Sequence, residues 1–459
     1  MEHTAHGYWL EEAGPVESLP PLDGERSADV VVIGGGYTGL WAAWHVKKLE
    51  PNASVVVLEG DVCGNGPSGR NGGFCNSMWF SLPNMRGRWG DAGALAVARA
   101  ARDAIDGVEV FCRDEGVDAW FRRGGYLQVS TAPAHDGAWD EAWAACGDLG
   151  QECVQPLRPA EVAERCASPA FRGGAFYPDA ATVQPARLAF GLRERLLAAG
   201  VEIYERSPVR RLVGAVAHTA AGTVRAGAAV VAIGGAAKAP GGPLRDSLTV
   251  TSSHIVLTEP VPELLEEIGW TGGECITDSR ALIDYFRTTP DGRIAFGWGG
   301  GRIAMGARLH GRAELDPDVI AATTARLHEY FPGLTGRRIT HAWGGPIDVS
   351  PTHLPVVMPL HGRAFAAAGY TGNGVGPAYM VARTLASLAL DRRDDHARLP
   401  IVDLSPQRVP PEPFHWLGGE VIRRALVKKE EAELVGQRPN PLSSLISRMP
   451  KLIGFHIGR

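Results

Sequence analysis

With 459 residues, the chain is long enough for two or three domains and can bury a large hydrophobic core. Hydrophobic residues make up 45% of it and charged residues 21%, which is ordinary for a globular protein and excludes a largely disordered chain. The net charge of -5 gives no overall attraction to nucleic acid, so nucleic acid is not an expected partner.

The cysteines and the N-terminus point to a cellular compartment. Seven cysteines at irregular spacing, without a C-x-x-C pair, argue against a disulfide framework and against a structural zinc site. The N-terminus lacks the basic and apolar pattern of a signal peptide, and no apolar stretch approaches the roughly 20 residues that span a bilayer. We therefore expect a cytoplasmic protein without a membrane span and without a metal.

The first elements in chain order form a βαβ unit. Asp29–Ile33 is an unbroken β-branched run typical of a buried parallel strand, Leu40–Leu49 has helical character, and Ser54–Leu58 is a second buried strand. Farther along, the patterns predict helices at 91–116, 138–166 and 185–199, and strands at 126–130, 202–204 and 228–233. The turn at 289–292 predicts an antiparallel hairpin between 281–288 and 293–298.

A glycine motif lies inside the βαβ unit. Gly34, Gly36 and Gly39 fit the pattern G-x-G-x-x-G, in which the glycines allow a tight turn, close approach to a pyrophosphate and helix packing on the strand. The helix that begins near Tyr37 would point its N–H groups at the phosphates. Glu59 ends the second strand, where a carboxylate accepts hydrogen bonds from ribose hydroxyls. This order of strand, helix, strand and acid predicts a dinucleotide site.

Two further glycine clusters favour FAD over NAD. Residues 64–73 (GNGPSGRNGG) directly follow the second strand and would run along the rest of a larger cofactor. Residues 369–376 (GYTGNGVG) precede a helix predicted at 379–390, whose N-terminus would stabilise negative charge on an electron-rich ring.

These motifs resemble those of the D-amino-acid oxidase-like family of FAD-dependent amine oxidoreductases. The resemblance covers roughly residues 28–400 and rests on VVIGGGYTGL with Glu59, SGRNGG at 68–73, DYFRTTPDGRIAFGW at 284–298 and GYTGNGVGPAYMVA at 369–382. His-Ala-Trp-Gly-Gly at 341–345 is similar to a segment in the branch that contains gamma-glutamylputrescine oxidases.

The resemblance implies non-covalent FAD, since the last cysteine is Cys275 and the second glycine loop carries Arg70 where covalent relatives have a histidine. It implies pyrophosphate at 34–39, the isoalloxazine along 70–73, the pyrimidine end at 372–375 and the adenine side at Val209. The predicted cofactor-binding residues are Gly34, Gly36, Tyr37, Thr38, Gly39, Glu59, Ser68, Gly69, Arg70, Asn71, Gly72, Gly73, Val209, Gly234, Gly372, Asn373, Gly374 and Val375.

Buried parallel strands interleaved with antiparallel ones predict an α/β domain and an α+β domain, with the chain crossing between them. The predicted fold class is α/β, with a Rossmann-like FAD-binding domain and an interleaved α+β substrate domain built on an antiparallel sheet. A lead-in covers 1–28 and a basic tail 401–459. The FAD-binding domain takes 29–75, 155–249 and 345–400, and the substrate domain takes 76–154 and 250–344.

The implied reaction is hydride transfer from the carbon next to an amine nitrogen to the flavin, hydrolysis of the imine, and reoxidation by O2 to give H2O2. Two departures bear on it. Gly345 stands before Pro346, where amino-acid oxidases of this family place a carboxylate-binding arginine. Ala295 replaces a lysine that activates oxygen in sarcosine-oxidase-type enzymes. The alternatives are an amino-acid oxidase or dehydrogenase, and an FAD-binding subunit of a larger electron-transfer complex.

Three residues are predicted at the catalytic site. Tyr285 matches the family tyrosine that contacts substrate, and Arg287 shares its strand face because side chains alternate along a strand. Arg287 would anchor a distal acid or make a structural pairing, and Trp343 would shape the pocket or the flavin's surroundings. The expected partners are a small amine and O2, with a homo-oligomer left open. The tail after residue 420 carries eight basic and three acidic residues, which favours either an acidic or membrane partner or a solvated helix on the body.

Overall fold

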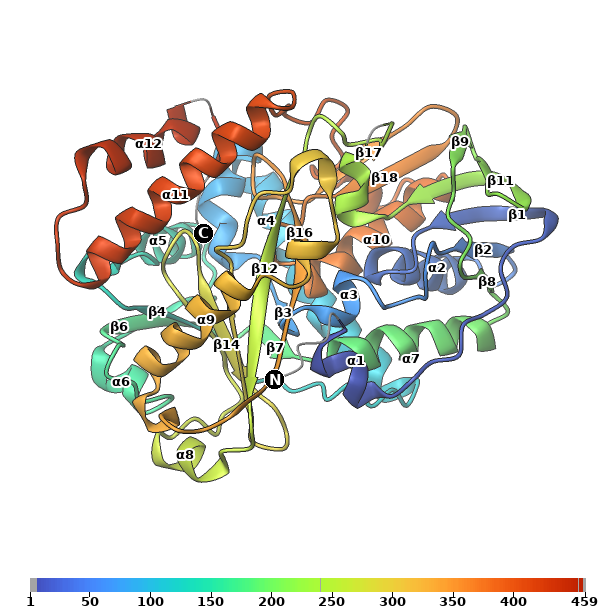
Figure 1. Ribbon diagram of the computed structural model, residues 1–459. Helices are drawn as coiled ribbons and strands as arrows, with labels where there is room; N and C mark the ends of the chain where they lie inside the picture. The colour runs from blue at the N-terminus through green and yellow to red at the C-terminus, as the bar shows by residue number, and fades with distance from the viewer. Residues whose placement is uncertain (1–5, 240, 453, 457–459) are drawn as a thin grey trace.

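The computed structural model describes residues 6–239, 241–452 and 454–456, and two large sheets dominate it (Figure 1). Within the described residues each of these sheets has eight strands. One contains the βαβ unit and the other contains the hairpin, so the predicted α/β class with two interleaved units is confirmed.

The first sheet is mostly parallel, in the order β17-β18-β11-β1-β2-β8, with β10 and β9 extending β11. Residues Val30–Ile33 of β1 are all buried between layers, which explains the unbroken apolar run. Helices α2 and α10 pack against each other over this sheet. The bounds are β1 Gly24–Ile33, β2 Val55–Leu58, β8 Glu202–Tyr204, β9 Arg211–Val213, β10 Val216–His218, β11 Gly222–Val231, β17 Val356–Pro359, β18 Ala364–Ala368, α2 Tyr37–Leu49 and α10 Val375–Ala389.

The second sheet is antiparallel except where β13 pairs with β4, in the order β16-β12-β15-β14-β13-β4-β6-β5. Its core stacks Phe286 on Phe296 and packs Trp270, Tyr330 and Phe331 around them. The predicted hairpin is confirmed as β14 and β15. The bounds are β4 Tyr126–Ser130, β5 Gln155–Leu157, β6 Gly173–Tyr177, β12 Thr249–Thr258, β13 Cys275–Asp278, β14 Asp284–Thr288, β15 Ile294–Trp298 and β16 Ile339–Val349.

Connecting elements surround these sheets. A small ribbon pairs β3 (Phe74–Asn76) with β7 (Ala180–Thr182). The remaining helices are α1 Gly7–Ala13, α3 Pro67–Arg70, α4 Leu82–Asp114, α5 Asp140–Asp148, α6 Pro159–Ala163, α7 Pro185–Ala198, α8 Pro262–Glu267, α9 Pro317–Tyr330, α11 Phe414–Leu434 and α12 Pro441–Leu452. No helix in the described part of the chain is both long and apolar enough to cross a membrane.

The prediction of one helix over 138–166 is wrong. Helix α5 ends at Asp148, the chain then turns through Gly150, which has a positive φ of 64°, and β5 and α6 follow. Strands β5 and β6 pair in the second sheet, so the predicted domain boundary at residue 155 falls inside that sheet.

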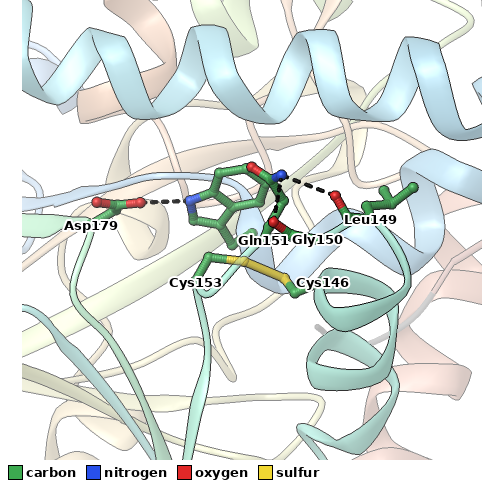
Figure 2. Close-up of a disulfide and its surroundings, with 7 residues drawn as sticks. Cys146, Leu149, Gly150, Gln151, Cys153 and Asp179 are labelled. Carbon is green, nitrogen blue, oxygen red and sulfur yellow. Dashed lines mark hydrogen bonds between the residues drawn. A yellow bond between two sulfur atoms is a disulfide. The ribbon is translucent and has the colours of Figure 1, made fainter.

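The same turn carries a disulfide that irregular cysteine spacing did not indicate. Cys146 and Cys153 are bonded across it, beside the Gln151 amide, which donates to the carbonyl oxygens of Leu149 and Gly150 (Figure 2). The cysteine spacing argued against a disulfide framework, and it did not predict this one bonded pair. The other five cysteines are buried and free.

The C-terminal tail forms two helices, α11 and α12, that pack against each other and lie on the second sheet's side of the molecule (Figure 1). Glu430 of α11 is buried, and its carboxylate accepts hydrogen bonds from the backbone N–H groups of Ala281 and Leu282, at 2.7 and 3.3 Å. Helix α11 is thus attached to the segment that leads into β14.

Glu430 belongs to a buried cluster in which carboxylates outnumber guanidinium groups. Arg280 pairs with Asp278 and with Asp284, and Arg326 lies 3.7 Å from Asp284. Two arginines therefore face three carboxylates, and one bound proton makes the cluster neutral. Burial accordingly raises the pKa of Glu430 to about 7.

We expect Glu430→Gln to remove a pH dependence of stability. The folded chain keeps the proton of Glu430 up to about pH 7, whereas an unfolded chain loses it near 4.5. The resulting stabilisation is complete below pH 4.5 and is lost as the pH rises through about 7. Between about pH 5 and about pH 8, wild type should lose about 2–3 kcal/mol more free energy of unfolding in urea than Glu430→Gln. Equal losses in both proteins would contradict this, and Glu431→Gln, at an exposed neighbour, serves as the control.

Candidate functional site

A cavity of about 920 Å³ lies where the two sheets meet. Ile33, Leu58 and Ala232 line it from the carboxyl ends of β1, β2 and β11, the edge at which open parallel sheets bind ligands. The opposite walls come from β12, β14 and β16 of the second sheet, and helix α11 of the tail closes part of it. Its volume is at the upper end of the range of about 300–1,000 Å³ that small-molecule and cofactor sites occupy.

The first glycine motif forms the turn from β1 into α2. Gly34 has a φ of 109°, which only glycine adopts without strain, and a Cβ at Gly39 would collide with the carbonyl oxygen of Gly34. Helix α2 therefore begins directly against the end of β1. Its N-cap, Gly36, makes no side-chain cap, and the N–H of Tyr37 donates to the Ser68 hydroxyl at 2.9 Å.

Glu59 lies at the end of β2 and lines the cavity. Its carboxylate accepts hydrogen bonds from the backbone N–H groups of Gly35 at 2.5 Å and of Asp61 at 2.9 Å. Burial raises its pKa. The side chain is thus held between the glycine turn and the cavity, where it can accept further hydrogen bonds.

The second glycine loop contains helix α3 and is held from the second sheet. The indole N–H of Trp343, on β16, donates to the carbonyl oxygen of Arg70 at 2.8 Å. The guanidinium of Arg70 lies 3.1 Å from the Glu314 carboxylate. Gly72 leaves room for the Tyr285 ring, since a Cβ there would stand 3.0 Å from it.

The third glycine cluster forms the N-terminus of α10. Gly374 is its N-cap, and the Asn373 amide donates to the carbonyl oxygen of Ser77 at 3.1 Å. The hydroxyls of Tyr370 and Thr38 are hydrogen-bonded at 2.6 Å, which joins the third cluster to the first. All three glycine clusters therefore meet at one cavity.

Comparison with known proteins identifies the family. The FAD-dependent oxidoreductase (DAO) family matches residues 29–388, more than three quarters of the chain. The chain belongs to this family.

Individual relatives agree with this assignment. The chain is 29% identical over 444 residues to a probable oxidoreductase OrdL of Rhizobium meliloti, covering 92% of this chain and 95% of that protein. It is 28% identical over 435 residues to gamma-glutamylputrescine oxidoreductase of Escherichia coli, covering 91% of this chain and 97% of that protein. The solved glycine oxidase of Geobacillus kaustophilus has a similar fold, with a TM-score of 0.67 and 20% identity over 84% of this chain and all of that one.

The protein is therefore an FAD-dependent oxidoreductase, and the cavity fits that cofactor. It combines adequate volume, a side-chain-free turn at a helix N-terminus and a half-buried carboxylate one strand away. The volume accommodates a dinucleotide, the helix N-terminus suits its pyrophosphate, and the carboxylate suits its ribose.

Most predicted site residues line this cavity. They are Gly34, Gly36, Tyr37, Thr38, Glu59, Ser68, Arg70, Asn71, Gly72, Val209, Gly234, Gly372, Asn373, Gly374, Val375 and Tyr285. Gly39, Gly69 and Gly73 lie behind its wall, where a Cβ would collide with the carbonyl oxygens of Gly34, Gly64 and Val183 respectively. These three glycines act through packing.

Arg287 and Trp343 also lie behind the wall. The buried Arg287 guanidinium donates to the carbonyl oxygen of Val183 at 2.5 Å and stacks over Trp9 at 5.4 Å. Arg287 was predicted either to anchor a distal acid of the substrate or to make a structural pairing, and this geometry is that of a structural pairing. Arg287 does not line the cavity, so the geometry does not support a substrate-anchoring role. Trp343 holds the backbone of Arg70 and so shapes the loop around the cavity from outside.

Several cavity residues escaped sequence reasoning. Asp348 lines the cavity and accepts a hydrogen bond from the N–H of Gly369 at 2.7 Å, and burial raises its pKa to about 6. The sequence feature that could have indicated Asp348 as a cavity residue is its position three residues after Gly345 on the same strand, β16. Ile422, Arg423 and Leu426 of α11 also line the cavity, and no motif in the tail indicated this.

We expect Gly39→Ala to lose FAD affinity while the second sheet stays folded. The added Cβ would push α2 away from the carbonyl oxygen of Gly34, which displaces the helix N-terminus from the cofactor. Overpacking of this kind costs about 1–3 kcal/mol, so FAD should dissociate about tenfold or more readily in a fluorescence titration. Gly87→Ala is the matched control, since its Cβ would meet no described atom within 4 Å. Unchanged FAD affinity in Gly39→Ala would disprove the role of this contact.

Proposed function

We propose that this chain oxidises the C–N bond of an amine to an imine, which water hydrolyses to an aldehyde or ketone and an amine or ammonia. The observation that carries the proposal is Gly345. It lines the cavity at the position before Pro346, and no described atom beyond its chain neighbours lies within 4 Å of the place for its Cβ. The wall therefore has open space where a carboxylate-binding arginine would stand. A larger amine with a distal polar group fits that space better than a simple amino acid.

In this proposal the three glycine clusters hold FAD. The N–H groups at the start of α2 would bind the pyrophosphate, and the carboxylate of Glu59 would accept hydrogen bonds from the adenosine ribose. Arg70–Gly72 would run along the isoalloxazine. Gly372–Val375, at the N-terminus of α10, would face the pyrimidine end, where the helix dipole stabilises negative charge. Val209 and Gly234 would lie on the adenine side.

When bound, FAD would supply the two-electron acceptor for a hydride from the carbon next to the amine nitrogen; the two electrons, together with two protons, would then reduce dioxygen to hydrogen peroxide. Tyr285, which lines the cavity, would orient the amine. Its hydroxyl is hydrogen-bonded to the Ser253 hydroxyl at 2.7 Å, and burial raises its pKa to about 12, so it remains protonated at neutral pH. The Ser253 hydroxyl donates to the carbonyl oxygen of Trp298 at 2.9 Å, so the Tyr285 hydroxyl donates to Ser253. The tyrosine oxygen can then accept a hydrogen bond from an N–H of the unprotonated amine, which is the form that loses hydride.

Two charged cavity residues would recognise the distal polar group. Asp348 carries a carboxyl with a pKa of about 6 and is ionised at higher pH, so it would attract a cationic group. Arg423 donates to the carbonyl oxygens of Gly300 and Gly301, at 3.1 and 2.8 Å, and would attract an anionic one.

The cofactor is non-covalent in this proposal. None of the cysteines in the described residues lines the cavity, and Cys275 is buried in β13, where its thiol donates to Asn76. A cysteine linkage to the flavin therefore has no candidate here. Acid precipitation should release the FAD into the supernatant.

The test is an anaerobic titration of the yellow protein with extended amines and with simple amino acids, followed by air. We expect an extended amine to bleach the flavin spectrum and air to restore it with release of hydrogen peroxide. Slow recovery of the flavin spectrum in air would indicate that the electron acceptor is not dioxygen. Bleaching by glycine or D-alanine alone would overturn the proposal in favour of an amino-acid oxidase or dehydrogenase, for which Arg287 no longer offers an anchor.

We expect Gly345→Arg to change the substrate preference. The open space accepts a longer side chain, and a guanidinium there would bind a substrate carboxylate bidentately. The kcat/KM for simple amino acids should rise by about tenfold, and that for extended amines should fall by a similar factor. Gly345→Leu controls for bulk, and it should lower turnover of extended amines without the gain. A gain in both variants would contradict the electrostatic argument.

A further inference from the structure

The last helix, α12, has its apolar and polar faces reversed. The residues that it buries against the body are Ser443, Ser447 and Pro450. Its exposed large apolar residues are Leu442, Leu445, Met449 and Leu452, spaced three or four positions apart and therefore on one side of the helix. A helix that only packs on a globular body turns its leucines inward, so packing on the body does not explain this arrangement.

Helix α11 continues the exposed apolar surface. Phe414, Leu417 and Val421 are exposed and follow the same spacing. Helices α11 and α12 pack against each other as a hairpin (Figure 1). We call the seven exposed apolar side chains of the two helices the outer face of the hairpin. Each of the seven is 46–78% exposed. Isolated exposed leucines are common, whereas an ordered stripe on two adjacent helices marks a binding surface.

The charges beside the outer face are almost all positive. Arg424 and Lys428 extend the stripe of α11 at the next helical positions, and Arg448 and Lys451 flank the stripe of α12. Arg438, in the link between the helices, is also exposed. Among the described residues 414–452, Glu431 is the only exposed acidic one, because Glu420 and Glu430 are buried and Glu433 pairs with Lys429 at 2.7 Å.

The two sides of the hairpin have separate tasks. Gly419, Ile422 and Leu426 line the cavity, and at 100° per residue they lie on the side of α11 opposite to Phe414, Leu417 and Val421. The inner side is attached to the body through Glu430 and through Arg423, which donates to the carbonyl oxygens of Gly300 and Gly301. The outer face therefore takes no part in forming the cavity and is presented on a fixed support.

We propose that the outer face docks the enzyme on an anionic membrane surface. An apolar stripe flanked by lysine and arginine is the pattern of helices that lie in the lipid interface, where the leucines enter the acyl boundary and the basic residues meet lipid phosphates. A second copy of this chain would bring an equally positive surface against the first, and like charges repel. The lipid surface supplies both the apolar layer and the opposite charge.

The test is co-sedimentation of the full-length, FAD-loaded enzyme with lipid vesicles. We expect binding to vesicles of phosphatidylcholine mixed with phosphatidylglycerol, little binding to phosphatidylcholine alone, and weaker binding as salt is added. The combined variant Leu442→Ser, Leu445→Ser and Met449→Ser should bind the mixed vesicles about tenfold or more weakly. The double variant Arg448→Gln with Lys451→Gln should also bind the mixed vesicles about tenfold more weakly. Both variants should keep their flavin spectrum and turnover, because none of these residues lines the cavity.

A matched control replaces apolar residues that are exposed elsewhere, Leu197→Ser, Val213→Ser and Leu404→Ser, and it should bind vesicles like wild type. Wild-type enzyme that stays in the supernatant with the mixed vesicles would overturn the proposal, as would full binding by the triple serine variant of α12. Sedimentation velocity without lipid tests whether the outer face binds a second copy of this chain instead. A dimer that the α12 variant converts to a monomer would assign the outer face to a second copy of this chain and also overturn the proposal.

Discussion

The distance between α2 and the end of β1 is the constraint on which the site depends. Only a residue without a Cβ fits at Gly39 against the carbonyl oxygen of Gly34, and this contact brings the N-terminus of α2 to the cavity. The hydroxyls of Thr38 and Tyr370 then join this turn to the third glycine cluster, so the position of α10 follows from that of α2. The side-chain-free backbone leaves room for a large anionic ligand, and the helix dipole favours its charge.

The second sheet contributes a wall and also holds the second glycine loop in place. Within the second glycine loop the Asn71 amide binds the backbone of Pro67, Ser68 and Gly73. The loop is also held from behind by the indole of Trp343 and by the Glu314 carboxylate near Arg70. Arg287 holds the backbone behind this loop. Its guanidinium donates to the carbonyl oxygen of Val183, next to strand β7, which pairs with β3. Trp343 and Arg287 therefore affect the cavity indirectly, through the backbone segments that they hold in position.

Local patterns predicted the fold well where the structure itself is local. The βαβ unit, its glycine turn and the β14–β15 hairpin depend on neighbours in sequence, so the run at 29–33 and the turn at 289–292 were sufficient. The helix expected over 138–166 failed because a glycine turn and pairing with β6 outweighed helical propensity there. Alternation placed Arg287 on the face of Tyr285, but it could not show that Trp9, from a distant helix, covers that end of the strand.

The tail shows why hydrophobic patterning alone does not reveal what a helix does. In α11 a carboxylate, Glu430, is buried because a cluster of two arginines and two other acids shares its charge and two backbone N–H groups bind it. In α12 serines are buried while leucines face outward. Inside and outside are therefore reversed in α12, and burial cannot be inferred from residue type. A hairpin held to the body by polar contacts leaves its apolar side chains available for a second surface, and the positive charge around them selects a negatively charged one.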